Sequence, residues 1–333
     1  MSWDPRDVLR AAGVLLVASI ASTLLPTGGA AAEPSYPDRP IRIIVGFAAG
    51  GPADFAARVI GDELSKALGQ PIVIENASGA GGNIATDRAV KAVPDGYTLV
   101  LATSGMIIIN PMLYKNLTFD TVKDFAPITL LVFEPNILLI HPSLSVKSLG
   151  ELITLIKNRP GQVNYASSGS GTSTHLSAEM FRTMAGLNIV HVAYKGNPPA
   201  ITDLLSGRVS MMFLNGSTAA PLAQSGRLRP IAVGGLKRAS ALPEVPTMSE
   251  SGLPGYESVA WSGIMAPAGT ATDIINKLHV ELNKFVLGPE MRERLALVAS
   301  EPGGQGPAEF SALFVKDIDR WAKVVKESGA RPD

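Results

Sequence analysis

The sequence contains no cysteine among its 333 residues. This absence excludes disulfide bridges, thiolate metal ligands and cysteine nucleophiles, and also a lipid anchor on an N-terminal cysteine. Histidine is scarce too, and the four histidines, at 141, 175, 191 and 279, include no His-x-x-x-His pair. A histidine-rich metal site is therefore not expected, and nothing indicates a cofactor.

An excess of charge of either sign is also missing, because Lys and Arg together number 29 and Asp and Glu together also number 29. A nucleic-acid-binding protein needs a positive surface to replace counterions, so this balance argues against that class. It does not argue against one small anion in a local pocket. Hydrophobic residues make up 46% of the chain, and its length suits two ordinary domains with full cores.

No apolar run is long enough to cross a bilayer, which takes about 20 residues. The longest suitable run, residues 11–25, follows Arg6 and Arg10 and precedes three alanines that end at Ala32. Basic residues, an apolar run and small residues in this order are typical of a secretory signal peptide. We expect a signal peptide over residues 1–32, cleaved after Ala32, and a periplasmic location for the mature protein.

The first long helix of the mature chain has clear start and stop signals. Pro52 suits the first helical position, where its missing N–H needs no partner, and Gly69 is a typical helix end. Phe55, Val59 and Leu68 fall on one apolar face of this helix.

Short apolar strands and helices alternate along the chain, which predicts an α/β fold with mainly parallel sheets and helices on both faces. Three amphipathic helices without intervening strands are expected at the C-terminus. The predicted strands are 41–45, 71–75, 97–102, 163–166, 189–192, 209–213 and 231–233, and the predicted helices are 52–68, 86–92, 151–158, 173–185, 199–206, 271–287, 289–298 and 307–328.

Three loops rich in Gly, Ala, Ser and Thr, at residues 46–51, 78–83 and 167–175, each lead from a predicted strand toward a helix. A helix N-terminus offers unpaired N–H groups and a positive dipole, so it attracts anions. Glycines let the backbone approach a ligand, and hydroxyl groups add donors. Each loop alone is typical of a tight turn. Together, at the carboxyl ends of the strands, they predict a carboxylate site that needs no arginine.

Two other uses of these loops fit the sequence less well. Gly79, Gly81 and Gly82 do not fit a dinucleotide-binding G-x-G-x-x-G pattern, because Ile84 stands at its last position. A serine hydrolase would use Ser168 or Ser170 with His175, and this alternative lacks the G-x-S-x-G turn. It predicts turnover that Ser170→Ala abolishes.

Several other polar or aromatic residues stand out. Asp54 and Arg58 are spaced for a salt bridge at i and i+4. His191, between two valines in a strand, fits a core histidine better than a ligand. Lys195 is more typical of a side chain exposed to solvent. Trp261 either lines a cleft or packs between domains.

Seven short motifs distributed over the chain resemble one known family, the Bug receptors, which are the extracytoplasmic binding proteins of tripartite tricarboxylate transporters. The similarity covers about residues 36–333. The motifs are Tyr-Pro-Asp-Arg-Pro-Ile at 36–41, Ala-Gly-Gly-Pro-Ala-Asp-Phe-Ala-Ala-Arg at 49–58, Ser-Gly-Ser-Gly-Thr at 168–172 with His175 and Leu176, Tyr-Lys-Gly at 194–196, Asp-Leu-Leu at 203–205, Leu-Pro-Glu-Val-Pro-Thr at 242–247 and Ala-Pro-Ala-Gly-Thr at 266–270.

This resemblance implies a two-lobed periplasmic-binding-protein fold of type 2 (a Venus flytrap) with C-terminal helices. Lobe 1 would comprise residues 36–138 and 255–333, and lobe 2 residues 139–254. It further implies a non-enzymatic receptor that captures a small carboxylate for the membrane permease subunits of a tripartite tricarboxylate transporter. A sensory role, in which the closed form contacts a receptor kinase, needs the same fold and is the alternative within binding.

The resemblance also assigns ligand-binding residues from both lobes. The chain departs from many relatives at Leu214, where an aspartate often stands. If Leu214 faces the cleft, a partner for a ligand ammonium group is missing, so we expect a dicarboxylate or an aromatic acid rather than an amino acid. The assigned residues are Phe47, Ala49 and Gly51 in lobe 1, Ser168, Gly169, Thr172 and His175 in lobe 2, and Ser104 and Asn215 nearby.

Overall fold

A computed structural model of the chain describes residues 36–330, apart from the side chain of Pro52. The predicted signal peptide and its cleavage site after Ala32 lie outside the described residues. From Pro37 onward the residues cluster into one unit.

Ten strands within residues 36–330 pair in the order β2-β1-β3-β9-β4-β7-β5-β6, and β8 and β10 also pair with β4. The strands are β1 (Ile41–Val45), β2 (Ile72–Asn76), β3 (Thr98–Thr103), β4 (Phe125–Ile140), β5 (Asn164–Ser167), β6 (Val190–Ala193), β7 (Met211–Asn215), β8 (Arg229–Val233), β9 (Val259–Pro267) and β10 (Glu301–Pro302).

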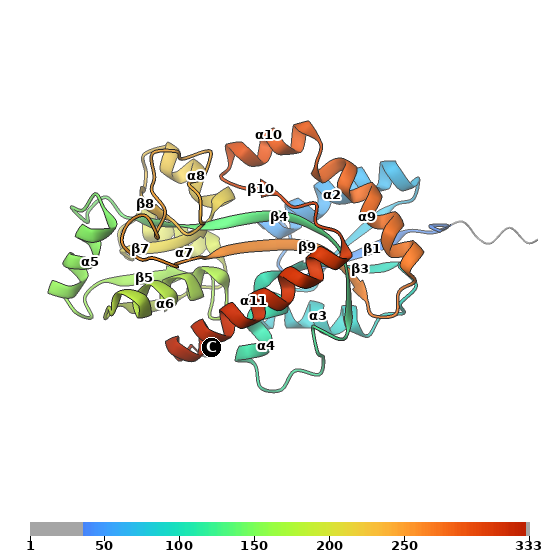
Figure 1. Cartoon of the computed structure of the whole chain (residues 1–333), viewed down its shortest axis with the longest axis horizontal. Helices are drawn as coiled ribbons and strands as arrows, with labels where there is room; N and C mark the ends of the chain where they lie inside the picture. Colours follow the sequence, from blue (N-terminus) through green and yellow to red (C-terminus); the bar gives the residue numbers. More distant parts are fainter. Residues whose placement is uncertain (1–35, 331–333) are drawn as a thin grey trace, which may run out of the picture. The chain divides into compact units, whose positions relative to one another are not determined.

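The long strand β4 divides this arrangement into two sheets. Residues 125–135 of β4 pair with β9, and residues 136–140 pair with β7 and β8. The first sheet is therefore β2-β1-β3-β9-β4 and the second is β6-β5-β7-β4-β8. Each contains three parallel strands followed by an antiparallel one. In Figure 1, β4 and β9 run side by side. The lobe limits at 138 and 255 stay a prediction.

Helices pack against these strands: α8, α9 and α11 contact β4, α6 contacts β5 and β7, and α2 contacts β1 and β2. No helix within residues 36–330 is both long and apolar enough to cross a membrane. The helices are α2 (Pro52–Leu68), α3 (Asn83–Val90), α4 (Asn110–Leu113), α5 (Leu149–Asn158), α6 (Ser173–Ala185), α7 (Asn197–Leu205), α8 (Gly216–Gln224), α9 (Thr272–Val286), α10 (Pro289–Leu297) and α11 (Pro307–Ser328), with the short turns η1 (Ala80–Gly82) and η2 (Gly105–Ile109).

The predicted strands and helices are all present, with ends that differ by a few residues, so the α/β alternation is confirmed. The expectation of a strand-free C-terminal region is wrong in one place. The two-residue strand β10 separates α10 from α11 and pairs with Val132 and Phe133 of β4. Such a short strand is held by its partner, and its own sequence carries no strand pattern.

Helix α2 begins and ends where the proline and glycine signals predict, and Gly69 adopts φ 69° at its C-terminal cap. The predicted apolar face is wrong, because Phe55 is 70% exposed. Ile60 and Leu64 are buried instead, on the side of the helix that packs against β1, β2 and α9. Packing against the sheet decides the buried face, and a single exposed aromatic residue is tolerated.

Helix α11 packs against α6, η2 and β4, so it contacts elements of both sheets. Trp261 of β9 is 2% exposed and meets the Phe310 ring edge-on at 5.1 Å. Its indole Nε1–H donates to Asp317 Oδ2 at 2.7 Å. Of the two roles considered for Trp261, the structure therefore supports packing.

Candidate functional site

The predicted loops follow the carboxyl ends of parallel strands in both sheets. Strands β1, β2 and β3 are parallel, and residues 46–51, 77–83 and 104 follow them in that order. Strands β5, β6 and β7 are parallel as well, and residues 168–172 and 194–196 follow the first two. Because the carboxyl ends of parallel strands meet at one edge, each sheet presents its loops together, where ligands of α/β proteins usually bind.

The first two glycine loops touch each other. A methyl group added at Gly46 would lie 3.0 Å from Gly82 Cα and 2.9 Å from Met106 Sδ. Contacts this close are rare for real Cβ atoms, so a side chain where the chain leaves β1 would have to displace its neighbours. The loop at 46–51 and the loop at 78–83 therefore lie side by side.

The third loop joins them from the second sheet. Asn110, at the start of α4, donates from Nδ2 to the Gly81 carbonyl at 2.9 Å and to Asn83 Oδ1 at 2.8 Å. A methyl group added at Gly171 would lie 2.7 Å from Leu113 Cδ1 and 3.5 Å from Asn110 Oδ1. The structure thus brings together the three loops that the sequence singled out. Sequence reasoning missed Asn110, whose only signal is a polar residue directly after an apolar run.

Polar contacts with helix α2 and strand β2 fix the loop at 46–51. Asp54, in the first turn of α2, is 3% exposed and accepts the Gly50 N–H at 2.9 Å. It also accepts two bonds from Arg58, at 3.0 and 2.9 Å, so the predicted salt bridge is confirmed. The Arg58 guanidinium, followed by the Gly50 N–H, lowers the pKa of Asp54 from 3.8 to about 2. Asn76 Nδ2 donates to the Phe47 carbonyl at 3.0 Å.

The three assigned residues of this loop differ in exposure. Phe47 is half-buried and packs against the core, Ala49 is exposed, and Gly51 is half-buried. Gly51 is the N-cap of α2 and provides no side-chain cap. The first-turn N–H groups of α2 therefore meet no capping side chain from Gly51, which suits an incoming anion.

The loop at 168–172 is ordered by its own hydroxyl groups. Thr172 caps α6, since its Oγ1 accepts the His175 N–H at 3.4 Å and donates to the Gly169 carbonyl at 2.7 Å. Thr174 Oγ1 accepts the Ser168 N–H at 3.1 Å and lies 3.0 Å from Ser168 Oγ. The assigned residues Ser168, Gly169 and Thr172 are all half-buried, beside the N-terminus of a 13-residue helix.

His175 lies beneath this loop within a stack of aromatic rings. Its Nδ1 accepts the Gly171 N–H at 3.1 Å, and its ring is parallel to that of His191 at 4.1 Å. Tyr165 stacks on the other face of His191 at 4.8 Å, and His191 Nε2 lies 2.7 Å from Ser167 Oγ. His191 is thus a core histidine, as predicted. His175 is 4% exposed and holds the loop backbone through Nδ1.

Ser104 and Asn215 lie at the ends of β3 and β7. Ser104 is 1% exposed, and its Oγ accepts the Trp261 N–H at 3.4 Å. Asn215 is half-buried and precedes α8, where Ser217 Oγ donates to the Glu134 carboxylate. Burial raises the pKa of Glu134. The carboxyl group of Glu134 thus lies at the first turn of α8 and that of Asp54 at the first turn of α2, whereas the first turn of α6 has no acidic side chain.

The argument against an amino-acid ligand required Leu214 to face the cleft, and the structure does not place it there. Its side chain is fully buried in a hydrophobic cluster that includes Ile137, Val233 and Ala219. Side chains alternate along a strand, so Leu214 faces the core and Asn215 the opposite side. The argument from Leu214 against an amine-bearing ligand is therefore wrong.

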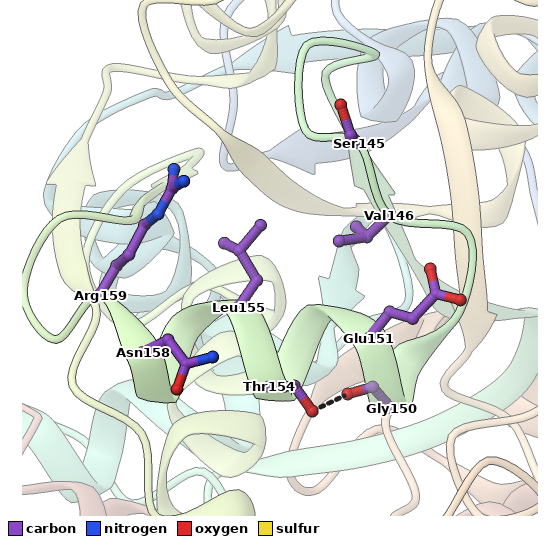
Figure 2. Close-up of a pocket in the computed structure, with 8 residues that line it drawn as sticks. All are labelled: Ser145, Val146, Gly150, Glu151, Thr154, Leu155, Asn158 and Arg159. Atoms are coloured by element: carbon purple, nitrogen blue, oxygen red, sulfur yellow. Dashed lines mark hydrogen bonds between the residues drawn. The ribbon is translucent and has the colours of Figure 1, made fainter.

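A hollow of about 630 Å³ lies beside α5, and Figure 2 shows Leu155 and Val146 extending toward it. It contains none of the assigned ligand residues. Its lining residues are Ser145, Val146, Gly150, Glu151, Thr154, Leu155, Asn158 and Arg159.

The two α/β sheets have the same strand order, and β4 belongs to both. This arrangement defines a two-lobed periplasmic-binding-protein fold, which solved structures share. Residues 56–330 match the family described as "Tripartite tricarboxylate transporter family receptor", TctC. The chain belongs to this family of solute-binding receptors, as the resemblance to Bug proteins predicted.

Three similar proteins illustrate the match. Protein BugT of Bordetella pertussis is 36% identical over 317 residues, which cover 94% of this chain and 97% of BugT. The structure "R. palustris Rpa4515 with adipate" is 37% identical with a TM-score of 0.84, and covers 90% of this chain and 100% of that one. MatC from Rhodopseudomonas palustris with bound malate is 32% identical with a TM-score of 0.80, covering 87% and 100%.

Proposed function

We propose that this protein captures a small dicarboxylate between its lobes and delivers it to the membrane permease of a tripartite tricarboxylate transporter, in the periplasm. The observation that supports this most is the meeting of three glycine-rich loops from two sheets. Two of them lead into long helices, α2 and α6, whose N-termini favour negative charge. Lobe 1 would be residues 36–138 and 255–333, and lobe 2 residues 139–254.

In this proposal Phe47, Ala49 and Gly51 hold one side of the ligand, and Ser168, Gly169 and Thr172 hold the other. Ser104 and Asn215 complete the site, and His175 holds the loop at 168–172 through the Gly171 N–H. Backbone N–H groups at helix N-termini bind a carboxylate without a cationic side chain. Closure of the lobes buries that carboxylate, because a ligand that contacts both lobes favours the closed state.

Dicarboxylates are the proposed ligand class because two similar proteins carry adipate and malate in their structures. A distal carboxylate needs a second polar region. In this proposal Ser104 and Asn215, at the ends of β3 and β7, provide it. The burial of Leu214 removes the earlier reason to reject an amino acid, so aspartate belongs among the compounds to be tested.

The test is calorimetric titration of the purified protein with adipate, malate, aspartate and benzoate. We expect adipate or malate to bind with a micromolar or lower Kd and to raise the Tm. Ser168→Ala should weaken binding by roughly tenfold or more, since a hydrogen bond to a charged group is lost. Ser143→Ala is the matched control, because Ser143 is exposed and bonds only locally to His141.

Binding of benzoate or aspartate with no binding of adipate and malate would contradict the dicarboxylate class. Turnover of an ester or amide that Ser170→Ala abolishes would contradict the receptor itself. A closed form that binds a sensor kinase instead of a permease would replace the transporter partner.

A further inference from the structure

The contact between Gly171 and His175 makes the ligand loop dependent on one protonation state. The Gly171 N–H donates to His175 Nδ1 at 3.1 Å. A nitrogen that accepts this bond carries no proton, so the single N–H proton of the neutral ring is on Nε2. His175 is 4% exposed, and its position in the first turn of α6 is fixed by the Thr172 cap.

Protonation of Nδ1 turns the acceptor into a donor that faces another donor. The Gly171 N–H then loses its partner, and the loop that contains Gly169 and Thr172 loses one of its attachments. The new positive charge is also 4.1 Å from the parallel ring of His191. Histidine is the side chain that most commonly gains or loses a proton between pH 5 and pH 8.

We propose that His175 is a positioning residue that makes carboxylate binding pH-dependent: neutral His175 holds the loop at 168–172 in its binding form, and protonation releases it. The proposal rests on the receptor function proposed above and adds its regulation. His175 acts through Gly171 and not by contact with the ligand, which revises the direct role that the resemblance assigned to it.

The charged and titratable groups around His175 come from several elements. β5 contributes Tyr165, whose ring centre is 6.4 Å away, and β6 contributes His191. On α6 itself, Glu179 is paired with Arg182 at 2.7 Å. The Ser328 carbonyl of α11 accepts a hydrogen bond from Arg182 Nη2 at 2.9 Å. Residues 136–140 of β4 and all of β7 carry no titratable side chain.

Two substitutions of similar volume distinguish the loss of the hydrogen-bond acceptor at position 175 from the gain of a positive charge there. In His175→Asn, the amide oxygen takes the position of Nδ1 and accepts the Gly171 N–H at every pH. His175→Leu fills a similar volume without an acceptor. Adipate affinity is measured by calorimetry from pH 8 to pH 5. The carboxyl groups of adipate titrate identically for all variants, so the comparison between proteins isolates the contribution of His175.

We expect the wild-type affinity to fall by about tenfold more than that of His175→Asn over this range, since one proton competes with the ligand. His175→Leu should bind weakly at both ends of the range. His141→Asn, which removes a histidine outside the site, should follow the wild type. Equal pH profiles for the wild type and His175→Asn would overturn the proposal. Loss of the pH dependence in His191→Gln alone would assign it to the neighbouring ring.

A ligand-free measurement keeps this test independent of ligand identity. In ¹⁵N NMR spectra, we expect the chemical shifts of His175 Nδ1 and the Gly171 amide to change with the same midpoint between pH 8 and pH 5. An imidazole that stays neutral to pH 5, or a Gly171 signal that does not respond, contradicts the switch. Failure of adipate and malate to bind at pH 8 instead contradicts the proposed ligand class, and the spectra then decide the switch alone.

Discussion

At the residue scale, Asp54 is the side chain on which the loop at 46–51 most depends. It links the Gly50 N–H to Arg58, and both contacts favour its charged form. Because its pKa falls from 3.8 to about 2, the carboxylate stabilises the folded state fully above the unfolded pKa. This contribution is lost as the pH falls through about 2.

Asp54→Asn should therefore lower the Tm by several degrees at pH 7 and weaken adipate binding. The difference in Tm between wild type and variant should shrink between pH 4 and pH 2, where the wild-type carboxylate takes up its proton. Thermal denaturation followed by circular dichroism checks this. Asp62→Asn, the same change at an exposed position of α2, should leave the Tm unchanged. A constant difference across this pH range would argue against the charge as the cause.

The sequence predicts the Asp54–Arg58 pair because spacing alone brings i and i+4 together on a helix. It does not predict that Asp54 is buried or that it holds Gly50, since both depend on how α2 meets the loop. Asn110 shows the same limit. Its bonds to Gly81 and Asn83 join segments 27 or more residues apart, and no local pattern contains such a contact.

At the element scale, α11 is attached to β9 through one buried hydrogen bond. Trp261 Nε1 donates to Asp317, which is 2% exposed, and burial raises the pKa of that carboxyl. Arg320 Nη2 lies 3.4 Å from the other oxygen. Trp261→Phe removes the donor and leaves a buried carboxylate, so we expect a loss of about 2 to 4 kcal/mol in the free energy of unfolding.

Asp317→Asn in the Trp261→Phe background should recover part of this loss, since a neutral amide costs less to bury than a carboxylate. Urea denaturation at pH 8 measures both variants. Trp321→Phe is the matched control: Trp321 is also buried on α11, and its Nε1 makes no hydrogen bond within the described residues. Equal losses for the two tryptophans would mean that ring volume, not the hydrogen bond, stabilises this contact.

Elements were predictable where the chain carries its own boundary signals. Pro52 and Gly69 delimit α2 by backbone geometry that no distant contact alters. Strands β4 and β9 were not predicted, although they pair with each other over residues 125–135 of β4. Pro127 and Pro135 interrupt the strand pattern of β4, and its neighbours in two sheets, not its own periodicity, hold it extended.

At the scale of the whole molecule, the two sheets meet where Gly171 packs against Leu113. Leu113 belongs to α4, after the first sheet's β3, and Gly171 follows β5 of the second sheet. The two halves were predictable from repeated α/β units and the family resemblance. The contact between them was not, because it depends on the relative position of two sheets whose pairing changes within β4.

Gly171 has φ 82°, and a methyl group there would lie 2.7 Å from Leu113 Cδ1. Gly171→Ala should therefore hold the two sheets further apart, raise the radius of gyration of the adipate-bound form and weaken adipate binding. Leu113→Val removes Cδ1, so Gly171→Ala/Leu113→Val should regain part of the affinity although the backbone strain at position 171 remains. Small-angle scattering and calorimetry measure the two effects.

Gly186→Ala separates strain from collision, because Gly186 has φ 61° with no atom within 4 Å of an added methyl group. It should cost stability without changing either measurement. If Gly171→Ala weakens binding but Leu113→Val restores none of it, the strained backbone of the loop is the cause, and close approach of the sheets at this point is not required for capture. If the double variant recovers both affinity and the smaller radius, the Gly171–Leu113 contact limits how far the lobes close around the ligand.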